Sequence, residues 1–166
     1  MRAVGLTRFN AASERQQMHL LYEVCSSPIW ARRVLAAAPF RDADALYDRA
    51  DRVLAELPDA ELDAALDGHP RIGATADNPS SAREQARVAG ADADIKAALA
   101  AKNREYEDRF GYVYLVCASG RSAEELLDIL TERLHNDPDT ERRVMRSELA
   151  KINRLRLERL LSEPHE

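Results

Sequence analysis

The sequence predicts an all-α protein, a single compact domain over residues 1–166 with about eight helices. Only 6 of the 166 residues are glycine, about half the usual share of roughly 7%. Ala, Leu, Arg and Glu dominate the composition, and all four have high helix propensity. Residues 112–118, YVYLVCA, form the one β-prone run. Because no second strand is available to pair with it, we expect an extended segment or a helix start there.

Cap residues, prolines and glycines mark four helices in the first 68 residues. Asn10 or Ser13 can cap the first of them, and Ser27 followed by Pro28 is typical of an N-cap and the first helical residue. Pro39 stops the second helix, and Gly68 is a natural stop for the fourth. The expected helices cover, in order, residues 10–25, 28–38, 42–56 and 59–67.

The rest of the chain begins with a segment of no helical period, HPRIGATADNPS at residues 69–80, which we expect to be an ordered loop. Ser81 with Glu84 has the spacing of a capping box, as does Ser122 with Glu125. The expected helices cover residues 81–88, 91–110, 122–135 and 137–161.

Composition also excludes several classes of protein. A hydrophobic share of 45% excludes a disordered chain, and no stretch reaches the ~18 uncharged apolar residues of a membrane span. The net charge of −5 argues against nucleic acid as a partner. Two cysteines and an N-terminus without an apolar signal core favour the cytoplasm.

His69 and Pro70 are the first candidate site residues. A histidine beside a proline sits on stiffly held backbone, and imidazole has an ordinary pKa near neutrality. His69 is therefore a candidate acid or base. A surface or helix-capping histidine explains the same pattern.

Ser81, Glu84 and Gln85 are the second set of candidates, because spacings of three and four residues place them on one face of a helix. They offer a hydroxyl, a carboxylate and an amide at a helix N-terminus, where the dipole favours anions. A plain capping box on a solvated helix is the alternative.

Arg156 is the third candidate because it falls inside the apolar stripe of the last expected helix, with Met145, Leu149, Ile152 and Leu160. A guanidinium on a core-facing stripe needs a carboxylate, a phosphate or carbonyl groups, since an unpaired buried charge is costly. Arg156 can therefore pair with an internal carboxylate or bind an anionic ligand.

The segment after Gly111 is the fourth candidate. A glycine at a helix end, followed by an apolar run, can bring backbone N–H groups close to a ligand. A helix end followed by core explains the pattern equally well. No metal set is expected, because His19 and His135 lack a metal-ligand spacing, and the apolar flank of Cys117 is typical of an inert thiol.

Several segments together resemble one known family in the order in which they occur. They are FNAAS from Phe9, CSSPIWARRVLAAAPF from Cys25, HPRIG from His69, SAREQA from Ser81, YEDRFGYVYLVCASGRS from Tyr106 and ELAKINRLRLERL from Glu148. The set resembles the 2-oxo-4-hydroxy-4-carboxy-5-ureidoimidazoline (OHCU) decarboxylases of uric acid degradation, over almost the whole chain.

The resemblance implies an all-α homodimer that decarboxylates OHCU to (S)-allantoin without a metal or organic cofactor. It implies three catalytic residues: His69 as general acid and base, Glu84 orienting His69 or the substrate, and Arg156 binding an anionic or carbonyl oxygen. The substrate-binding residues that it implies are Pro70, Ser81, Gln85, Tyr112, Val113, Tyr114, Leu115 and Val116, the last five through their backbone.

The substrate's own chemistry is consistent with the absence of a cofactor. A ring C=N bond lies next to the carbon that loses CO₂ and can take up the electron pair of the broken bond. In other decarboxylases a pyridoxal or thiamin cofactor accepts that electron pair. Two alternatives remain at this stage: a non-catalytic helical interaction module, and a metal-dependent hydrolase that uses His69 and Glu84.

Overall fold

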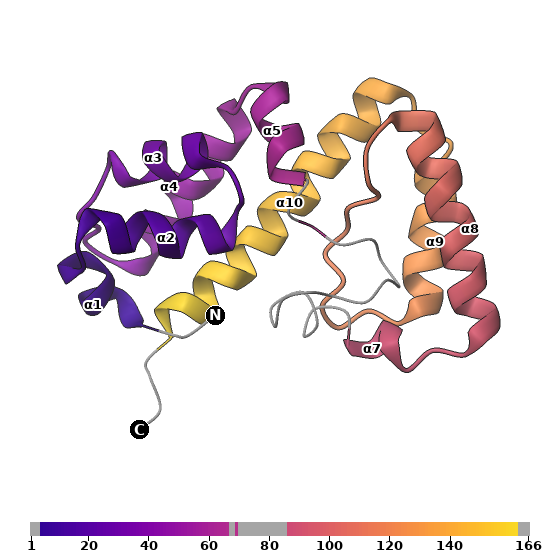
Figure 1. The fold of residues 1–166 in the computed structure, drawn as a ribbon, viewed down its shortest axis with the longest axis horizontal. Helices are drawn as coiled ribbons and strands as arrows, with labels where there is room; N and C mark the ends of the chain where they lie inside the picture. The colour runs from indigo at the N-terminus through magenta and orange to yellow at the C-terminus, as the bar shows by residue number, and fades with distance from the viewer. Residues whose placement is uncertain (1–3, 67–68, 70–85, 163–166) are drawn as a thin grey trace. The chain divides into compact units, whose positions relative to one another are not determined.

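The computed structural model describes residues 4–66, 69 and 86–162, and within these residues the only regular elements are helices (Figure 1). The predicted all-α class is confirmed. Contacts divide the chain into two compact units. Unit 1 comprises residues Met1–Gly68 and Ala150–Glu166, and unit 2 comprises His69–Leu149. That residues 1–166 form one folding domain stays a prediction.

Unit 1 contains five helices among its described residues, together with the end of α10. Three of these helices start at the cap signals, because Ser13 forms a capping box with Gln16, and Ser27 and Asp42 accept hydrogen bonds from the backbone N–H of the first turn. The helices are α1 (Gly5–Ala11), α2 (Glu14–Val24), α3 (Pro28–Leu35), α4 (Ala43–Glu56), α5 (Asp59–Leu66) and α10 (Pro138–Leu161). The helix α3 corresponds to the predicted helix 28–38, but it ends at Leu35, three residues earlier than predicted.

The first helix, α1, was not predicted. Its N-cap, Val4, makes no side-chain cap bond, so the sequence carries no local start signal. Long-range bonds hold it instead: the Val4 amide donates to the Leu160 carbonyl at 2.8 Å, and the Gln17 side-chain amide donates to the Phe9 carbonyl at 2.8 Å.

The core of unit 1 forms around fully buried side chains of α1 to α5. Trp30 is fully enclosed, and its indole N–H donates to the Ala50 carbonyl at 3.3 Å, which ties α3 to α4. Asn10 makes two bonds to the backbone of Phe40 and so fixes the turn that precedes α4. The largest apolar members of this core include Phe9, Leu21, Leu46, Leu54 and Leu62.

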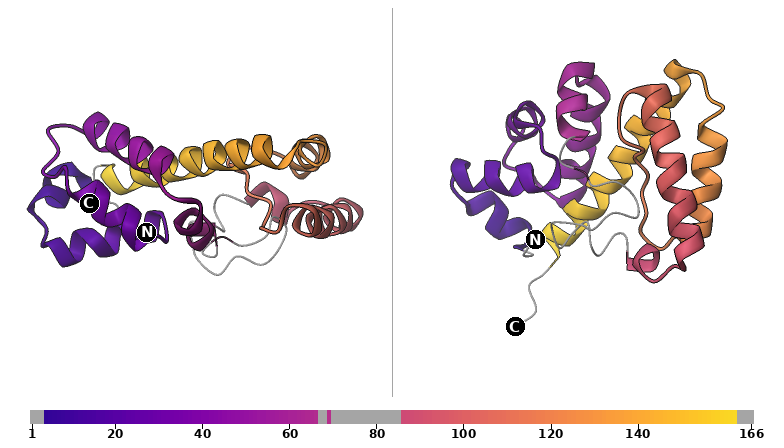
Figure 2. Two further views of the ribbon diagram at one scale, coloured as in Figure 1. Left: turned by 90° about the horizontal axis from the view of Figure 1, so that it is seen from above. Right: turned by 45° about the vertical axis from the view of Figure 1, so that its right-hand side comes forward.

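Unit 2 is built on the antiparallel neighbours α8 (Ala93–Phe110) and α9 (Ala123–Arg133), with the short α7 (Ala86–Ala89) and the start of α10. Asp92 and Ser122 cap α8 and α9. Gly111 ends α8 in the left-handed conformation, with φ +83°, as predicted. Figure 2 shows α10 as one continuous helix.

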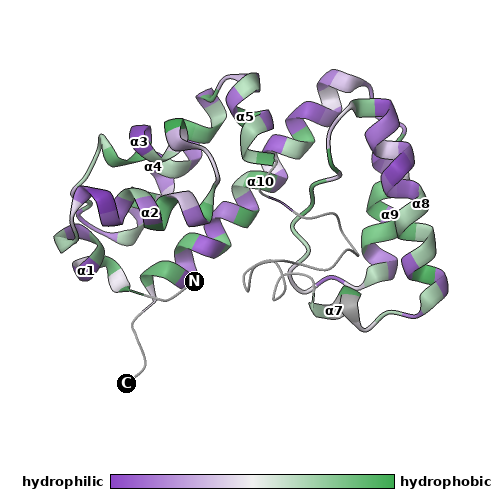
Figure 3. Cartoon of the chain, viewed as in Figure 1, coloured by the Kyte–Doolittle hydropathy of each residue, from purple (hydrophilic) through white to green (hydrophobic). Residues whose placement is uncertain are grey.

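Residues 113–118 are extended, as predicted, and they run between α8 and α9. Their apolar side chains join the core of unit 2, which comprises Val88, Leu99, Tyr106, Tyr114, Val116, Ala118, Ala123, Leu126 and Leu130. Figure 3 shows polar and apolar residues alternating along the helices that surround this core. Within the described part of the chain, no helix is long and apolar enough to cross a membrane.

Candidate functional site

His69 is buried, with 9% of its surface exposed, and its Nε2 atom is shielded from solvent. A freely exposed surface histidine is therefore the wrong interpretation. A buried imidazole can move a proton only to or from a group brought close to it, which suits a site that encloses its ligand. Pro70, Ser81, Glu84 and Gln85 lie outside the described residues, as does most of the predicted loop 69–80 and helix 81–88.

Arg156 faces the core of unit 1, as its place on the apolar stripe predicts, and only 5% of it is exposed. Its Nη1 donates to the carbonyl of Val24 at 3.1 Å. Val24 is the last residue of α2, where helix carbonyls lack intrahelical partners and the dipole favours a cation. One partner is thus a carbonyl group at a helix end, and carbonyl groups were among the partner types expected from the sequence.

Cys25 follows Val24 and lies beside Arg156. Burial raises the pKa of the Cys25 thiol to about 11, while Asn153 and Arg156 act in the opposite direction. The thiol is therefore protonated near neutral pH, which is typical of a structural cysteine. Cys117 is only partly buried.

The extended segment in unit 2 contributes both side chains and backbone. Tyr114, Leu115 and Val116 are buried, whereas Tyr112 and Val113 are half-buried. No backbone-to-backbone hydrogen bond joins residues 112–116 to another described residue. Buried peptide groups need partners, so this backbone is suited to bind polar groups of a ligand.

A buried ion pair behind that segment was missed by sequence analysis. Arg133 donates through Nε to Glu141 Oε1 at 2.7 Å, and Tyr106 donates to the same oxygen at 2.5 Å. Glu141 is fully buried, and its Oε2 accepts from Asn136 at 3.0 Å. Burial lowers the pKa of Arg133, but Glu141 together with Tyr106 and Tyr114 more than offsets that effect, so the net shift of the pKa is upward.

This cluster holds the extended segment in place. The Nη1 of Arg133 donates to the Leu115 carbonyl at 2.7 Å, and its guanidinium lies 5.0 Å from the centre of the Tyr114 ring. The Tyr114 hydroxyl donates to the Leu126 carbonyl on α9 at 3.0 Å. The family resemblance implies that the backbone of residues 112–116 binds substrate, but the Leu115 carbonyl already accepts this hydrogen bond from Arg133. A signal existed in the sequence, because Arg133 continues the apolar positions of Leu126 and Leu130 at helical spacing.

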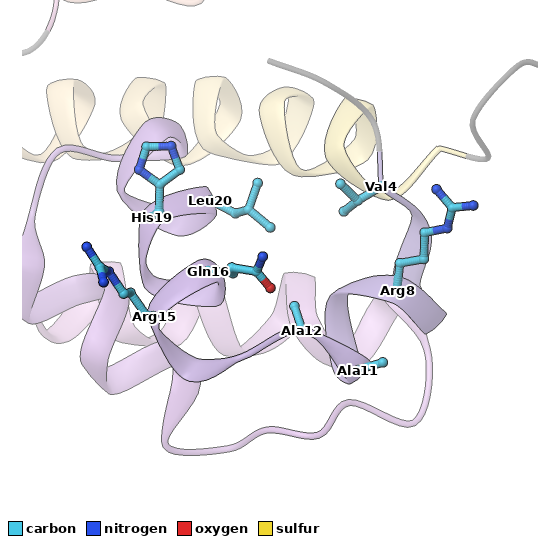
Figure 4. Close-up of a pocket in the computed structure, with 8 residues that line it drawn as sticks. All are labelled: Val4, Arg8, Ala11, Ala12, Arg15, Gln16, His19 and Leu20. Atoms are coloured by element: carbon cyan, nitrogen blue, oxygen red, sulfur yellow. The ribbon is translucent and has the colours of Figure 1, made fainter.

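A surface pocket of about 630 Å³ lies in unit 1 between α1 and α2 (Figure 4). It contains none of the predicted site residues. Its walls are mainly apolar, with Arg8, Arg15 and His19 at the edge, and His19 pairs with Glu23 at 2.8 Å. The full lining is Val4, Arg8, Ala11, Ala12, Arg15, Gln16, His19 and Leu20.

The predicted residues thus fall in two sets, with His69 and residues 112–116 in unit 2 and Arg156 in unit 1. That Arg156 shares a pocket with His69 and Glu84 stays a prediction.

Comparison with known proteins decides the family. Residues 10–158 match the family model of OHCU decarboxylase. The chain belongs to the OHCU decarboxylase family. The predicted family resemblance is confirmed.

Curated relatives of this OHCU decarboxylase family member agree. An OHCU decarboxylase from Amia calva is 30% identical over 144 residues, which are 82% of each chain. A uric acid degradation bifunctional protein from Arabidopsis thaliana is 31% identical over 84% of this chain and 45% of its own length. A bifunctional counterpart from a Bacillus strain is 26% identical over 95% of this chain and 32% of its own. The chain thus spans less than half the length of the two bifunctional relatives.

Solved structures agree on the fold. The crystal structure of an OHCU decarboxylase in the presence of (S)-allantoin superposes with a TM-score of 0.79 at 25% identity, covering 92% of this chain and all of that one. The structure of an (S)-allantoin synthase, at 14% identity, has a TM-score of 0.74 and shares the fold.

Proposed function

We propose that this chain decarboxylates OHCU to (S)-allantoin without a metal or organic cofactor. The family match over residues 10–158 is the observation that carries the proposal. The relative from Amia calva, which is itself an OHCU decarboxylase, supports it over most of both chains. The burial of His69 and Arg156, the two described residues to which the family resemblance gives catalytic roles, is consistent with it.

In the proposed reaction the C4–carboxylate bond breaks, CO₂ leaves, and the electron pair moves into the neighbouring ring C=N bond. The nitrogen takes up a proton. The resulting enol then loses its C4 hydroxyl proton, becoming a carbonyl, while C5 gains a proton. The sum is OHCU carboxylate plus one proton to allantoin plus CO₂. The face on which C5 is protonated sets the configuration of the product.

His69 is proposed to take the hydroxyl proton and to return a proton to one face of the ring. Imidazole can exchange protons in both directions near neutral pH. Glu84 is proposed to orient His69 or the substrate. Arg156 is proposed to bind an anionic or carbonyl oxygen through its planar fork, which suits paired oxygen acceptors.

The remaining contacts are proposed to hold the polar edges of the ring and of the ureido group. Pro70, Ser81 and Gln85 take this role, together with the backbone of residues 112–116. The lack of backbone-to-backbone hydrogen bonds between that segment and other described residues supports its part of the proposal. A homodimer located in the cytoplasm is proposed on the family resemblance and on the cysteine content.

The test follows OHCU decay spectroscopically, with the uncatalysed rate subtracted. We expect turnover by the wild-type protein that survives dialysis against EDTA, and loss of nearly all of it in folded His69→Asn. Activity lost on chelation and restored by one metal would support a metal-dependent hydrolase. A folded protein without turnover would support a non-catalytic interaction module instead.

A further inference from the structure

Asn153 is a buried amide of unit 1 that no role yet described explains. It lies on α10, and only 2% of its surface is exposed. Both polar atoms of its side chain, Nδ2 and Oδ1, are shielded from solvent and make no hydrogen bond with the described residues. The Cys25 thiol is the one side chain in hydrogen-bonding reach among the described contacts of Asn153, but a protonated thiol is a weak partner for an amide.

An unsatisfied buried amide destabilises a protein, and an apolar side chain of the same size avoids that cost. Leucine branches at Cγ as asparagine does, although it is larger, and it matches the stripe formed by Leu149 and Ile152 on the same helix. Packing alone therefore does not account for an amide here. A donor and an acceptor placed side by side in a dry region are suited to a ligand that offers the complementary acceptor and donor.

Arg156 lies close to Asn153 on α10. It is three residues beyond Asn153, so the two side chains lie on the same face of α10, one turn apart. The guanidinium is fixed by its bond to the Val24 carbonyl, and the Cys25 thiol, the next residue, interacts with both Asn153 and Arg156. A positive charge and an unsatisfied amide thus meet at the end of α2.

We propose that Asn153 and Arg156 form a recognition pair for a ureido or cyclic amide group that stands next to an anionic or carbonyl oxygen. The side-chain oxygen Oδ1 of Asn153 accepts a hydrogen bond from a ligand N–H, and its Nδ2 group donates one to the ligand carbonyl. Arg156 binds the neighbouring oxygen of the ligand. This inference rests on the proposed function, because OHCU and allantoin both carry a ureido group. It adds Asn153 as a residue that selects this group.

The test compares Asn153→Leu with the wild-type protein in three measurements: melting temperature, (S)-allantoin affinity by calorimetry, and OHCU kinetics. We expect an unchanged or higher melting temperature in Asn153→Leu, at least about tenfold weaker allantoin binding, and a KM for OHCU raised by a similar factor. Asn153→Asp should also bind allantoin weakly, because a carboxylate cannot donate and will pair with Arg156. Asn153→Ala replaces Asn153→Leu if the leucine disturbs folding.

Asn103 provides the matched control, because it is an equally buried asparagine on α8 of unit 2. We expect folded Asn103→Leu to keep the wild-type allantoin affinity. Wild-type affinity and KM in Asn153→Leu would overturn the inference while leaving the proposed function intact. If wild-type protein does not turn over OHCU, allantoin binding that depends on Asn153 would still support the pair. Wild-type protein that binds neither allantoin nor hydantoin would overturn it.

Discussion

Arg156 donates to the last carbonyl of α2, and this contact gives it a structural role beside the proposed role in substrate binding. The two roles separate in Arg156→Lys. A lysine keeps a positive charge near the helix end but loses the planar fork. We expect it to keep most of the stability and to lower kcat/KM for OHCU at least about tenfold. Arg156→Ala should lose turnover and also roughly 2 kcal/mol of unfolding free energy.

Urea unfolding and steady-state kinetics on both variants check this prediction. Loss of stability in Arg156→Lys equal to that in Arg156→Ala, with unchanged kcat/KM in the folded protein, would leave Arg156 as a structural residue alone.

Glu141 neutralises Arg133 in the core of unit 2, where Glu141 is fully buried and only 5% of Arg133 is exposed. Glu141→Gln keeps the shape but leaves the guanidinium without its counter-charge. We expect it to lower the unfolding free energy by about 3 kcal/mol, measured by urea unfolding. Glu158→Gln is the control, because its pair with Arg154 is partly exposed at 3.2 Å. That variant should change stability by less than about 1 kcal/mol, and equal losses in the two variants would contradict the prediction.

Cys25 predicts how stability depends on alkaline pH. Burial raises the pKa of its thiol from 9.0 to about 11 in the folded protein. Between these values the unfolded chain releases a proton that the folded protein keeps, so stability falls as pH rises. The slope from this one group approaches 1.4 kcal/mol per pH unit. Buried Tyr106 and Tyr114 act in the same direction above pH 10.

The comparison between wild-type protein and Cys25→Ala removes the tyrosine contribution, because both proteins contain it. We expect the stability difference between them to narrow as pH rises from 9 to 11, measured by urea unfolding. A difference that is constant over this range would show that the thiol ionises as readily in the folded as in the unfolded state.

At the scale of the element, the end of α8 depends on Gly111. Its φ of +83° is strained for any residue with a Cβ, and nothing lies within 4 Å of the position that a Cβ would take. Gly111→Ala should therefore cost about 1 kcal/mol through the backbone alone. Gly111→Asn should cost less, because asparagine tolerates this conformation. Thermal unfolding measures both, and a larger loss in the asparagine variant would contradict the backbone explanation.

Helix starts were predictable from sequence where a side chain caps its own helix. Ser13, Ser27 and Ser122 all form the cap bonds that their spacing indicates, because such bonds connect residues two or three apart. The start of α1 was not predictable, because the chain supplies its partner from Leu160, at the other end of the sequence.

The same distinction holds for the candidate site. Burial of Arg156 was predictable, since helical periodicity alone places it among apolar residues. One of its partners, the Val24 carbonyl, is 132 positions away, and no local pattern in the sequence connects the two residues. The Arg133–Glu141–Tyr106 cluster likewise joins α9, α10 and α8, so only the tertiary fold shows that these charges are neutralised rather than exposed.

At the scale of the whole molecule, the family match spans residues 10–158 and so covers all of unit 2 and most of unit 1. His69 belongs to one unit and Arg156 to the other. The protein's central task in this account is to control where a proton returns, because the substrate already supplies the place for the electrons.

The configuration of the product tests that account most directly. Uncatalysed decay of OHCU gives racemic allantoin, so any excess of one enantiomer must come from the protein. Circular dichroism of the allantoin formed from freshly generated OHCU measures this excess. We predict a large excess of (S)-allantoin with wild-type protein and a racemic product, at the uncatalysed rate, with folded His69→Asn. Racemic allantoin from the wild-type protein, or an undiminished (S) excess from His69→Asn, would contradict the account.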